Sequence, residues 1–131
     1  MATFQIENFV IFLGKQDQQI LPYYYSAAEM VVMPSHYESF GMVALEAMAC
    51  GKPVIASQVG GLAFLVRDGE TGFVIPGNDV EKLAGRLTDL IKNKELREKL
   101  GKQSAEYAQL YSWETISSKM IELYNQILEK I

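Results

Sequence analysis

Short apolar runs alternate along this chain with longer segments of helical pattern, and this alternation restricts the fold more than any other feature. The runs are rich in β-branched and aromatic residues and end at glycine, proline or a polar turn, as buried strands do. Strands that are apolar throughout and separated by helices form a parallel sheet covered on both faces. We therefore predict the α/β class with about four strands, over residues 9–14, 30–33, 54–57 and 73–76.

The segments between the runs carry the signals of helices. Asn78 and Glu81 form a capping-box pattern, Ser112 is placed to cap a further helix, and Gly51 is placed to end one. Three helices are expected at the C-terminal end of a single domain that covers residues 1–131. The expected helices cover residues 18–28, 40–50, 62–66, a segment from residue 78, residues 94–109 and a segment from residue 112.

Composition excludes several classes of protein. Apolar residues make up 49% of the 131 residues and charged residues 21%, which is an ordinary globular balance. The net charge of −4 argues against broad nucleic-acid binding, because that binding depends on neutralising phosphates. The single cysteine, Cys50, excludes an internal disulfide and fits a reducing compartment. The start lacks a basic signal-peptide region, and no apolar run reaches the ~20 residues of a membrane helix, so a cytoplasmic location is expected.

The candidate site lies in a loop and the helix that follows it. In parallel α/β sheets, ligands bind at the carboxyl ends of strands, and the loop PSHYESFG leaves the second strand and enters a helix. Backbone N–H groups at that helix start favour an anion, and Gly41 lets a phosphate approach closely. Glu38 lies just outside the helix and Glu46 about a turn and a half inside, so both carboxylates can point towards one crevice. Two acceptors for hydroxyl groups beside a phosphate site suggest a nucleotide sugar, with the ribose diol on one and the sugar on the other.

The spacing of the two glutamates does not decide this by itself. Carboxylates eight residues apart are common, and most of them are solvated. The residues alone therefore leave two interpretations open, a ligand site and a solvent-exposed pair.

A resemblance to a known family distinguishes between them. The segments ESFGMVALE, EAMACGKPVIAS, VGG and DGETGFVIP occur in this order, and the first carries the E-x7-E signature. From FVIFLG to about YSWE, the chain resembles the C-terminal domain of group 1, family-4 retaining glycosyltransferases with the two-domain GT-B architecture, in the branch that includes sucrose-phosphate synthases. The resemblance implies a Rossmann-like domain that binds the nucleotide-diphosphate-sugar donor of a hexosyltransferase.

The resemblance also implies a role for each matching residue. Glu46 is expected to hold the ribose hydroxyls of the donor nucleotide. Glu38, the expected catalytic-site residue, contacts hydroxyls of the donor sugar. The backbone N–H groups of Ser39, Phe40 and Gly41 face the diphosphate. The helix dipole then helps to stabilise the departing diphosphate.

The loop after the first strand has an implied role as well, at Gly14 and Lys15, which should lie against the base. The sequence has no Asp-x-Asp pair to hold a divalent cation, so neither a metal nor another cofactor is expected. One position departs from the family pattern, because Phe64 stands where many relatives carry a glutamate, and this puts the role of the VGG loop in doubt.

A second departure concerns the start of the chain. By resemblance, it begins after the strands that carry a basic diphosphate-binding pair, and the N-terminal acceptor domain is missing. Two of the strands that are missing would normally separate residues 9–13 from residues 30–33. We therefore expect either that these two segments pair directly or that chains self-associate, and we favour a four-stranded core with self-association.

Three functional hypotheses stay open at this point. The chain is the donor half of a retaining glycosyltransferase that is inactive alone, a non-catalytic nucleotide-binding module, or an α/β unit without a ligand. Other residues that carry chemistry have simpler explanations. His36 is interpreted as a loop residue, Cys50 as small packing at a helix end, and the tyrosine run at 23–25 as the flank of a helix on the sheet.

Overall fold

The computed structural model describes residues 5–131, and its centre is a three-stranded parallel sheet in the order β1-β2-β3. The strands are β1 (Val31–Met33), β2 (Val54–Ser57) and β3 (Gly72–Ile75). All pairings are parallel, and three of the predicted strands therefore form where the apolar runs placed them. The α/β class with a parallel sheet is confirmed.

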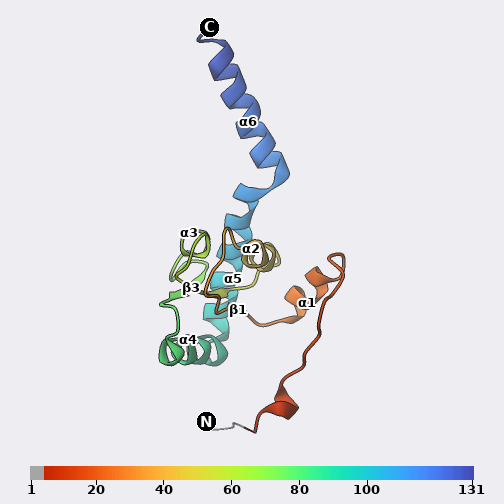
Figure 1. Cartoon of the computed structure of the whole chain (residues 1–131), viewed down its shortest axis with the longest axis vertical. Helices are drawn as coiled ribbons and strands as arrows, with labels where there is room; N and C mark the ends of the chain where they lie inside the picture. The colour runs from red at the N-terminus through yellow and green to blue at the C-terminus, as the bar shows by residue number, and fades with distance from the viewer. Residues whose placement is uncertain (1–4) are drawn as a thin grey trace.

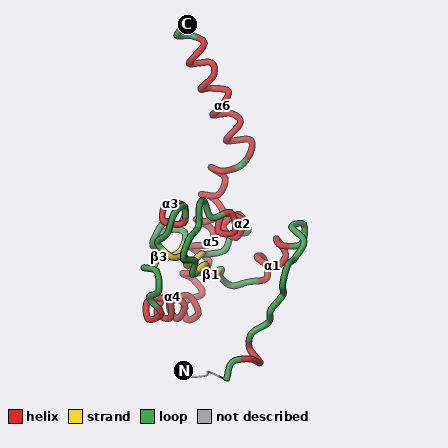
Figure 2. The backbone as a smooth tube through the Cα atoms, in the orientation of Figure 1, coloured by secondary structure: helices red, strands yellow, loops and turns green. Residues whose placement is uncertain are grey.

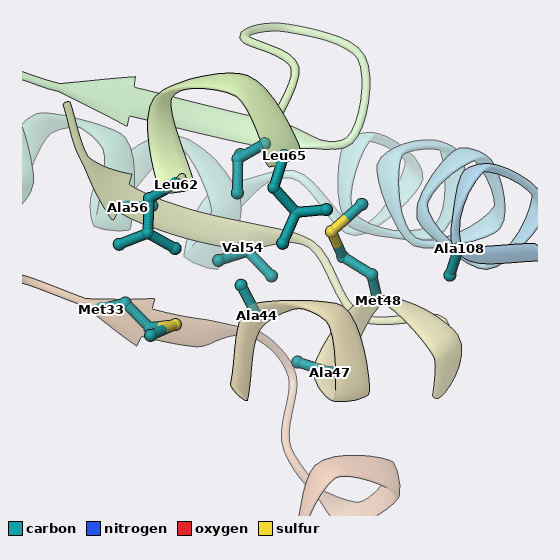
Figure 3. Close-up of a cluster of buried hydrophobic side chains, with 10 residues drawn as sticks. Met33, Ala44, Ala47, Met48, Val54, Ala56, Leu62, Leu65 and Ala108 are labelled. Carbon is teal, nitrogen blue, oxygen red and sulfur yellow. The ribbon is translucent and has the colours of Figure 1, made fainter. Parts of the chain in front are cut away.

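The core lies on both faces of this sheet because side chains of the central strand alternate between them. On one face, Val54 and Ala56 pack with α2 (Met42–Ala49) and α3 (Leu62–Leu65), as Figure 3 shows. On the other face, Ile55 packs with buried leucines of α4 (Val80–Lys92) and α5 (Lys94–Ala108). Strand β2 is buried along its whole length, which explains why its sequence VIAS has no exposed polar position.

Three helix ends can be compared with their predicted signals. Gly51 follows α2 with a left-handed φ of 73°, as a helix-ending glycine does. Ser112 caps α6 (Trp113–Leu128) by accepting from the N–H of Thr115, so that prediction is confirmed. The cap of α4 is Asp79 and not Asn78. Asn78 adopts φ 63°, which asparagine tolerates, and the Asp79 carboxylate then accepts from the N–H of Lys82 at 2.9 Å.

The predicted strand at residues 9–14 is wrong. The segment contains the end of a short 3-10 helix, η1 (Glu7–Phe9), followed by extended chain that pairs with no strand of the described residues. Residues 10–20, called the strap below, lead to α1 (Leu21–Ala27) and lie to the side of the body, which is the sheet with its covering helices (Figures 1 and 2). Direct pairing with residues 30–33 does not form, and Phe12 is 93% exposed. Apolar, β-branched composition favours a strand only where another strand supplies hydrogen bonds, and the run itself does not determine that partner.

The last helix also stands apart from the body. Helix α6 follows the short η2 (Gln109–Tyr111) and projects away from the sheet (Figure 1). None of its residues is buried. The predicted group of three helices at the C-terminal end, α4, α5 and α6, is therefore present, but only the first two cover the sheet. Within residues 5–131, no helix is both long and apolar enough to cross a membrane.

Candidate functional site

The loop at residues 34–41, which the sequence indicates as the candidate site, leads into the N-terminus of α2. Gly41 is the N-cap residue with φ 99°, and no side chain caps the helix there. This backbone angle favours glycine, and a Cβ at this position would lie 2.7 Å from Cδ2 of Leu62, whose side chain would have to move. Without a side-chain cap, the first N–H groups of α2 have the electrostatic character of an anion site.

A second loop holds the first one in place. The N–H of Gly61 donates to the carbonyl oxygens of Glu38 and Ser39, at 3.2 and 3.0 Å. The approach is close enough that a Cβ on Gly61 would lie 2.5 Å from the backbone of Ser39 and Phe40. The VGG segment therefore acts as a clamp on the loop at residues 38–40, which gives its two glycines a physical role.

Glu46 lies in the second turn of α2 and meets a tyrosine. The hydroxyl of Tyr25 on α1 donates to Oε2 of Glu46 at 3.0 Å. Both residues are partly buried. Since a carboxylate among apolar neighbours is unfavourable unless it is hydrogen-bonded, Tyr25 explains how α2 tolerates Glu46.

This pair borders a cavity between α1 and α2. The cavity has a volume of about 260 Å³, and its lining is mostly apolar. It is formed by Gln18, Leu21, Pro22, Tyr25, Glu46, Ala49 and Cys50. A mostly apolar hollow with a few polar groups has the composition of a small-molecule site, although this one is smaller than most such pockets.

The tyrosine is strongly perturbed by this arrangement. Burial of its ring disfavours the phenolate, and the hydrogen bond and negative charge of Glu46 act in the same direction, raising the pKa of Tyr25 to about 12. The hydroxyl of Tyr25 is therefore protonated at neutral pH and donates its hydrogen bond to Glu46. The sequence did not indicate this contact, because the three tyrosines at residues 23–25 carry no signal that separates the one facing Glu46 from the other two.

An aromatic row connects the clamped loop to the C-terminal part of the chain. Phe40 lies edge-on to Tyr111, and Tyr111 lies edge-on to Tyr107, each pair with ring centroids 5.7 Å apart. The guanidinium of Arg67 lies over the Tyr107 ring at 4.9 Å. The hydrogen bond between the two tyrosine hydroxyls raises the pKa of Tyr111, with burial as a further cause. These contacts hold the Phe40 end of the loop against η2.

The other predicted residues are placed differently. Gly14 and Lys15 are exposed on the strap and do not line the cavity beside Glu46, where Gln18 is the strap residue instead. Their expected contact with a base stays a prediction. His36 is exposed in its loop, as expected of a loop residue. Cys50 is half-buried at the C-terminal end of α2 and faces the carbonyl of Pro22, with the sulfur 4.0 Å away.

The fold and this loop place the chain among parallel α/β proteins that bind a ligand at one edge of the sheet. The chain is a parallel α/β unit in which a glycine-led helix N-terminus and polar side chains follow a strand, and ligands of such units bind at that edge of the sheet. The sequence profile of the family Glycosyl transferases group 1 matches residues 1–107. This chain therefore belongs to the group 1 glycosyltransferases, as the resemblance predicted.

Curated relatives and solved structures agree with this assignment. D-inositol 3-phosphate glycosyltransferase from Saccharomonospora viridis is 40% identical over 123 residues, which cover 94% of this chain and 28% of that protein. Sucrose-phosphate synthase from Thermosynechococcus elongatus superposes with a TM-score of 0.85 at 44% identity, over 96% of this chain and 32% of that one. Anabaena Alr3699/HepE, solved in complex with UDP-glucose, gives a TM-score of 0.82 at 31% identity, over 92% of this chain and 33% of that one.

The extent of these matches places the chain within a larger architecture. The chain spans less than a third of the length of each of these relatives. It also matches the C-terminal domain of a group 1 glycosyltransferase from Francisella tularensis, with a TM-score of 0.67 at 32% identity, over 76% of this chain and 50% of that one. The chain therefore corresponds to the C-terminal part of GT-B glycosyltransferases.

Proposed function

We propose that this chain binds the nucleoside-diphosphate-sugar donor of a retaining glycosyltransferase. Glu46 accepts hydrogen bonds from the ribose hydroxyls, and Glu38 contacts hydroxyls of the sugar. The backbone N–H groups of Ser39, Phe40 and Gly41 face the diphosphate at the start of α2. Alr3699/HepE supports this choice of ligand class, because one of its solved complexes contains UDP and glucose and another contains UDP-glucose.

One observation carries the proposal. Glu46 is a hydrogen-bonded carboxylate at the border of an apolar cavity, on the same helix whose N-terminus lacks a side-chain cap. A nucleoside diphosphate presents a diol and an anion, and these two chemistries match the carboxylate and the helix N-terminus respectively. A solvent-exposed pair of glutamates requires neither the cavity nor the uncapped helix.

The transfer reaction itself is proposed for a complete protein of this family. In this reaction the bond between the anomeric carbon and the diphosphate oxygen would break and a bond to the acceptor oxygen would form with retained anomeric configuration. The nucleoside diphosphate would leave, and the acceptor's proton would be released to solvent. Residues 1–131 alone are expected to bind the donor without transferring sugar, since transfer requires an acceptor held in near-attack geometry. A non-catalytic nucleotide-binding module is the alternative within the same ligand class.

The first prediction compares the two glutamates. Glu46→Ala should weaken binding of UDP, ADP or GDP by roughly ten- to a hundredfold, because charge-assisted hydrogen bonds of roughly 1.5–3 kcal/mol are lost. Glu38→Ala should leave the nucleotides almost unchanged and weaken the corresponding nucleotide sugar. Titration followed by NMR measures both effects and remains usable at the roughly millimolar affinities expected of a partial site.

A matched control shows whether such an effect is specific. Glu122→Ala removes an exposed carboxylate from the middle of α6 and should change neither binding nor the melting temperature. If Glu46→Ala and Glu122→Ala bind all three nucleotides equally well, Glu46 is not a ribose ligand. If the unaltered chain binds no nucleotide, the proposed function is wrong.

A further inference from the structure

Tyr25 is the inward-facing member of the tyrosine run. Its ring packs against the core cluster on the α2 face of the sheet, whereas Tyr23 is 76% exposed and Tyr24 is exposed beside the strap. Its hydroxyl reaches Oε2 of Glu46 from the neighbouring helix. A phenylalanine would place the same ring in the same contact, so the hydroxyl is not needed to fill the core.

We propose that Tyr25 is a positioning residue for Glu46, holding its carboxylate in the orientation that receives a ribose diol. This inference rests on the proposed function, because it assigns a purpose to the orientation of Glu46. Tyr25 itself need not touch the ligand. Its ring is anchored in the core, and the hydroxyl transmits that position to a flexible side chain on α2.

The hydrogen-bonding capacity of the pair fits this role. Tyr25 occupies one acceptor position on Oε2. Among the residues that the structure describes, no donor contacts Oε1 of Glu46. A carboxylate has about four acceptor positions, so Glu46 retains capacity for two hydroxyl groups while it is held. Restricting the carboxylate before the ligand arrives removes an ordering cost from binding.

No other charged or titratable group within residues 5–131 contacts the carboxylate of Glu46. Cys50 lines the same cavity, but its sulfur faces the carbonyl of Pro22. No salt bridge involves Glu46 within residues 5–131, so its contact with Tyr25 is the one that orients it. A purely structural tyrosine would affect folding stability but would not affect discrimination between ribose and a sugar without hydroxyls. That difference makes the inference testable.

The test uses the whole chain, NMR titration, and UDP, ADP and GDP, each beside its 2′,3′-dideoxy counterpart. Tyr25→Phe should weaken binding of the ribonucleotide by roughly three- to tenfold, the scale of one hydrogen bond, and leave the dideoxy nucleotide unchanged. In a Glu46→Gln background the same substitution should have little further effect on the preference for ribose. Tyr24→Phe, which removes a hydroxyl one position away on α1, should leave both nucleotides unchanged.

A measurement on the unaltered chain covers the case in which Tyr25→Phe does not fold. The ring resonances of Tyr25 should shift when the ribonucleotide is added and should shift much less with the dideoxy nucleotide. The inference is overturned if Tyr25→Phe keeps the full preference for ribose, or if the ring of Tyr25 responds equally to both nucleotides. Loss of the preference in Glu46→Gln but not in Tyr25→Phe overturns this inference and leaves the proposed function standing. If the unaltered chain shows no preference, both are wrong.

Discussion

Glu46 shares α2 with Ala44, Ala47 and Met48, which are all completely buried. A carboxylate in that setting raises the question of what compensates its desolvation, and the hydroxyl of Tyr25 at 3.0 Å supplies part of the answer. The same contact changes the tyrosine, since a phenolate beside a carboxylate in partly buried surroundings is unfavourable. At the scale of single residues, the candidate site therefore pairs a donor hydroxyl with a carboxylate acceptor, and this contact favours the protonated form of Tyr25.

A pH titration tests this coupling. Tyr25 should deprotonate near pH 12 rather than at the ordinary value of 10, because burial, then the hydrogen bond and charge of Glu46, raise its pKa. The folded protein holds this proton more tightly than the unfolded chain, so the contribution to the free energy of unfolding is full below pH 10. It is lost as the pH rises towards about 12. NMR of the tyrosine ring carbons follows the titration.

Variants assign the causes of that shift. Glu46→Gln removes the charge and should lower the pKa of Tyr25 part of the way towards 10, since burial remains. Tyr24→Phe removes the ring-carbon signal of Tyr24 that a tyrosine titration would otherwise include, and it should leave the pKa of Tyr25 unchanged. A tyrosine at position 25 that titrates at 10 in the unaltered chain would contradict the contact with Glu46.

Two glycines decide how the helices pack around the sheet. Gly101 in α5 lies against the turn at Gly51 that ends α2, and a Cβ at Gly101 would lie 2.2 Å from the carbonyl oxygen of Gly51. One turn further along, the hydroxyl of Ser104 donates to the carbonyl of Thr71 at 2.7 Å, just before β3. At the scale of elements, α5 therefore ties the end of the site helix to the beginning of the last strand. Small residues make this close approach feasible.

The two helical glycines of α4 and α5 should respond to alanine with opposite signs. Gly101→Ala should lower the free energy of unfolding by roughly 1–3 kcal/mol, because the methyl group meets backbone that cannot rotate away. Gly85→Ala, in α4, has no atom within 4 Å of the new methyl group and should raise that free energy by roughly 0.5–1 kcal/mol through helix propensity. Urea denaturation followed by circular dichroism measures both. Equal effects of the two substitutions would show that α5 does not pack as described.

The whole molecule has two parts that the core does not cover. The strap at residues 10–20 and helix α6 both lie outside the body in Figure 1. They expose large apolar side chains, with Phe12 93% and Trp113 81% accessible. Along α6, a stripe of partly exposed residues lies on one face of the helix, formed by Ile116, Met120, Leu123 and Ile127. Most helical stability in proteins comes from packing of an apolar face, and this face of α6 is left open within the chain.

We therefore expect the isolated chain to self-associate through the stripe of α6. Sedimentation velocity at roughly tens of micromolar should show dimers or larger species, driven by apolar burial. The double substitution Met120→Glu with Leu123→Glu should convert them to monomers while the sheet and its covering helices stay folded, since α6 contributes no buried residue.

A control with the same change in charge isolates the stripe. Ser118→Glu with Asn125→Glu alters the opposite face of α6, and these chains should still associate. A monomeric unaltered chain would contradict the prediction. Association that survives the Met120 and Leu123 substitutions would move the contact surface away from α6.

Much of the fold followed from local patterns in the sequence. The runs at β1, β2 and β3 are apolar because both faces of the sheet are covered, and their composition with the helices between them predicted these strands. Gly51 and Ser112 marked helix ends because both signals are local: glycine tolerates the left-handed backbone that ends a helix, and the serine hydroxyl caps the N–H groups that follow it. The loop at residues 34–41 could be selected as a site for a similar reason, since strand, loop and helix are consecutive. All of these are interactions between residues close together in the chain.

The tertiary structure decided the contacts between residues far apart in the chain. Residues 9–14 have a strand's composition and form no strand, because hydrogen bonds to a second strand must be supplied from elsewhere. Tyr25 and Glu46 are 21 positions apart and meet only because α1 and α2 pack together. The clamp of Gly61 on residues 38–40 depends in the same way on two loops returning to one edge of the sheet. The sequence by itself determined most of the helices and the three strands that form, and it selected the loop at residues 34–41 as a candidate site. Only packing decided which side chain contacts Glu46 and which apolar segments stay uncovered, because those outcomes depend on distance in space and not on distance along the chain.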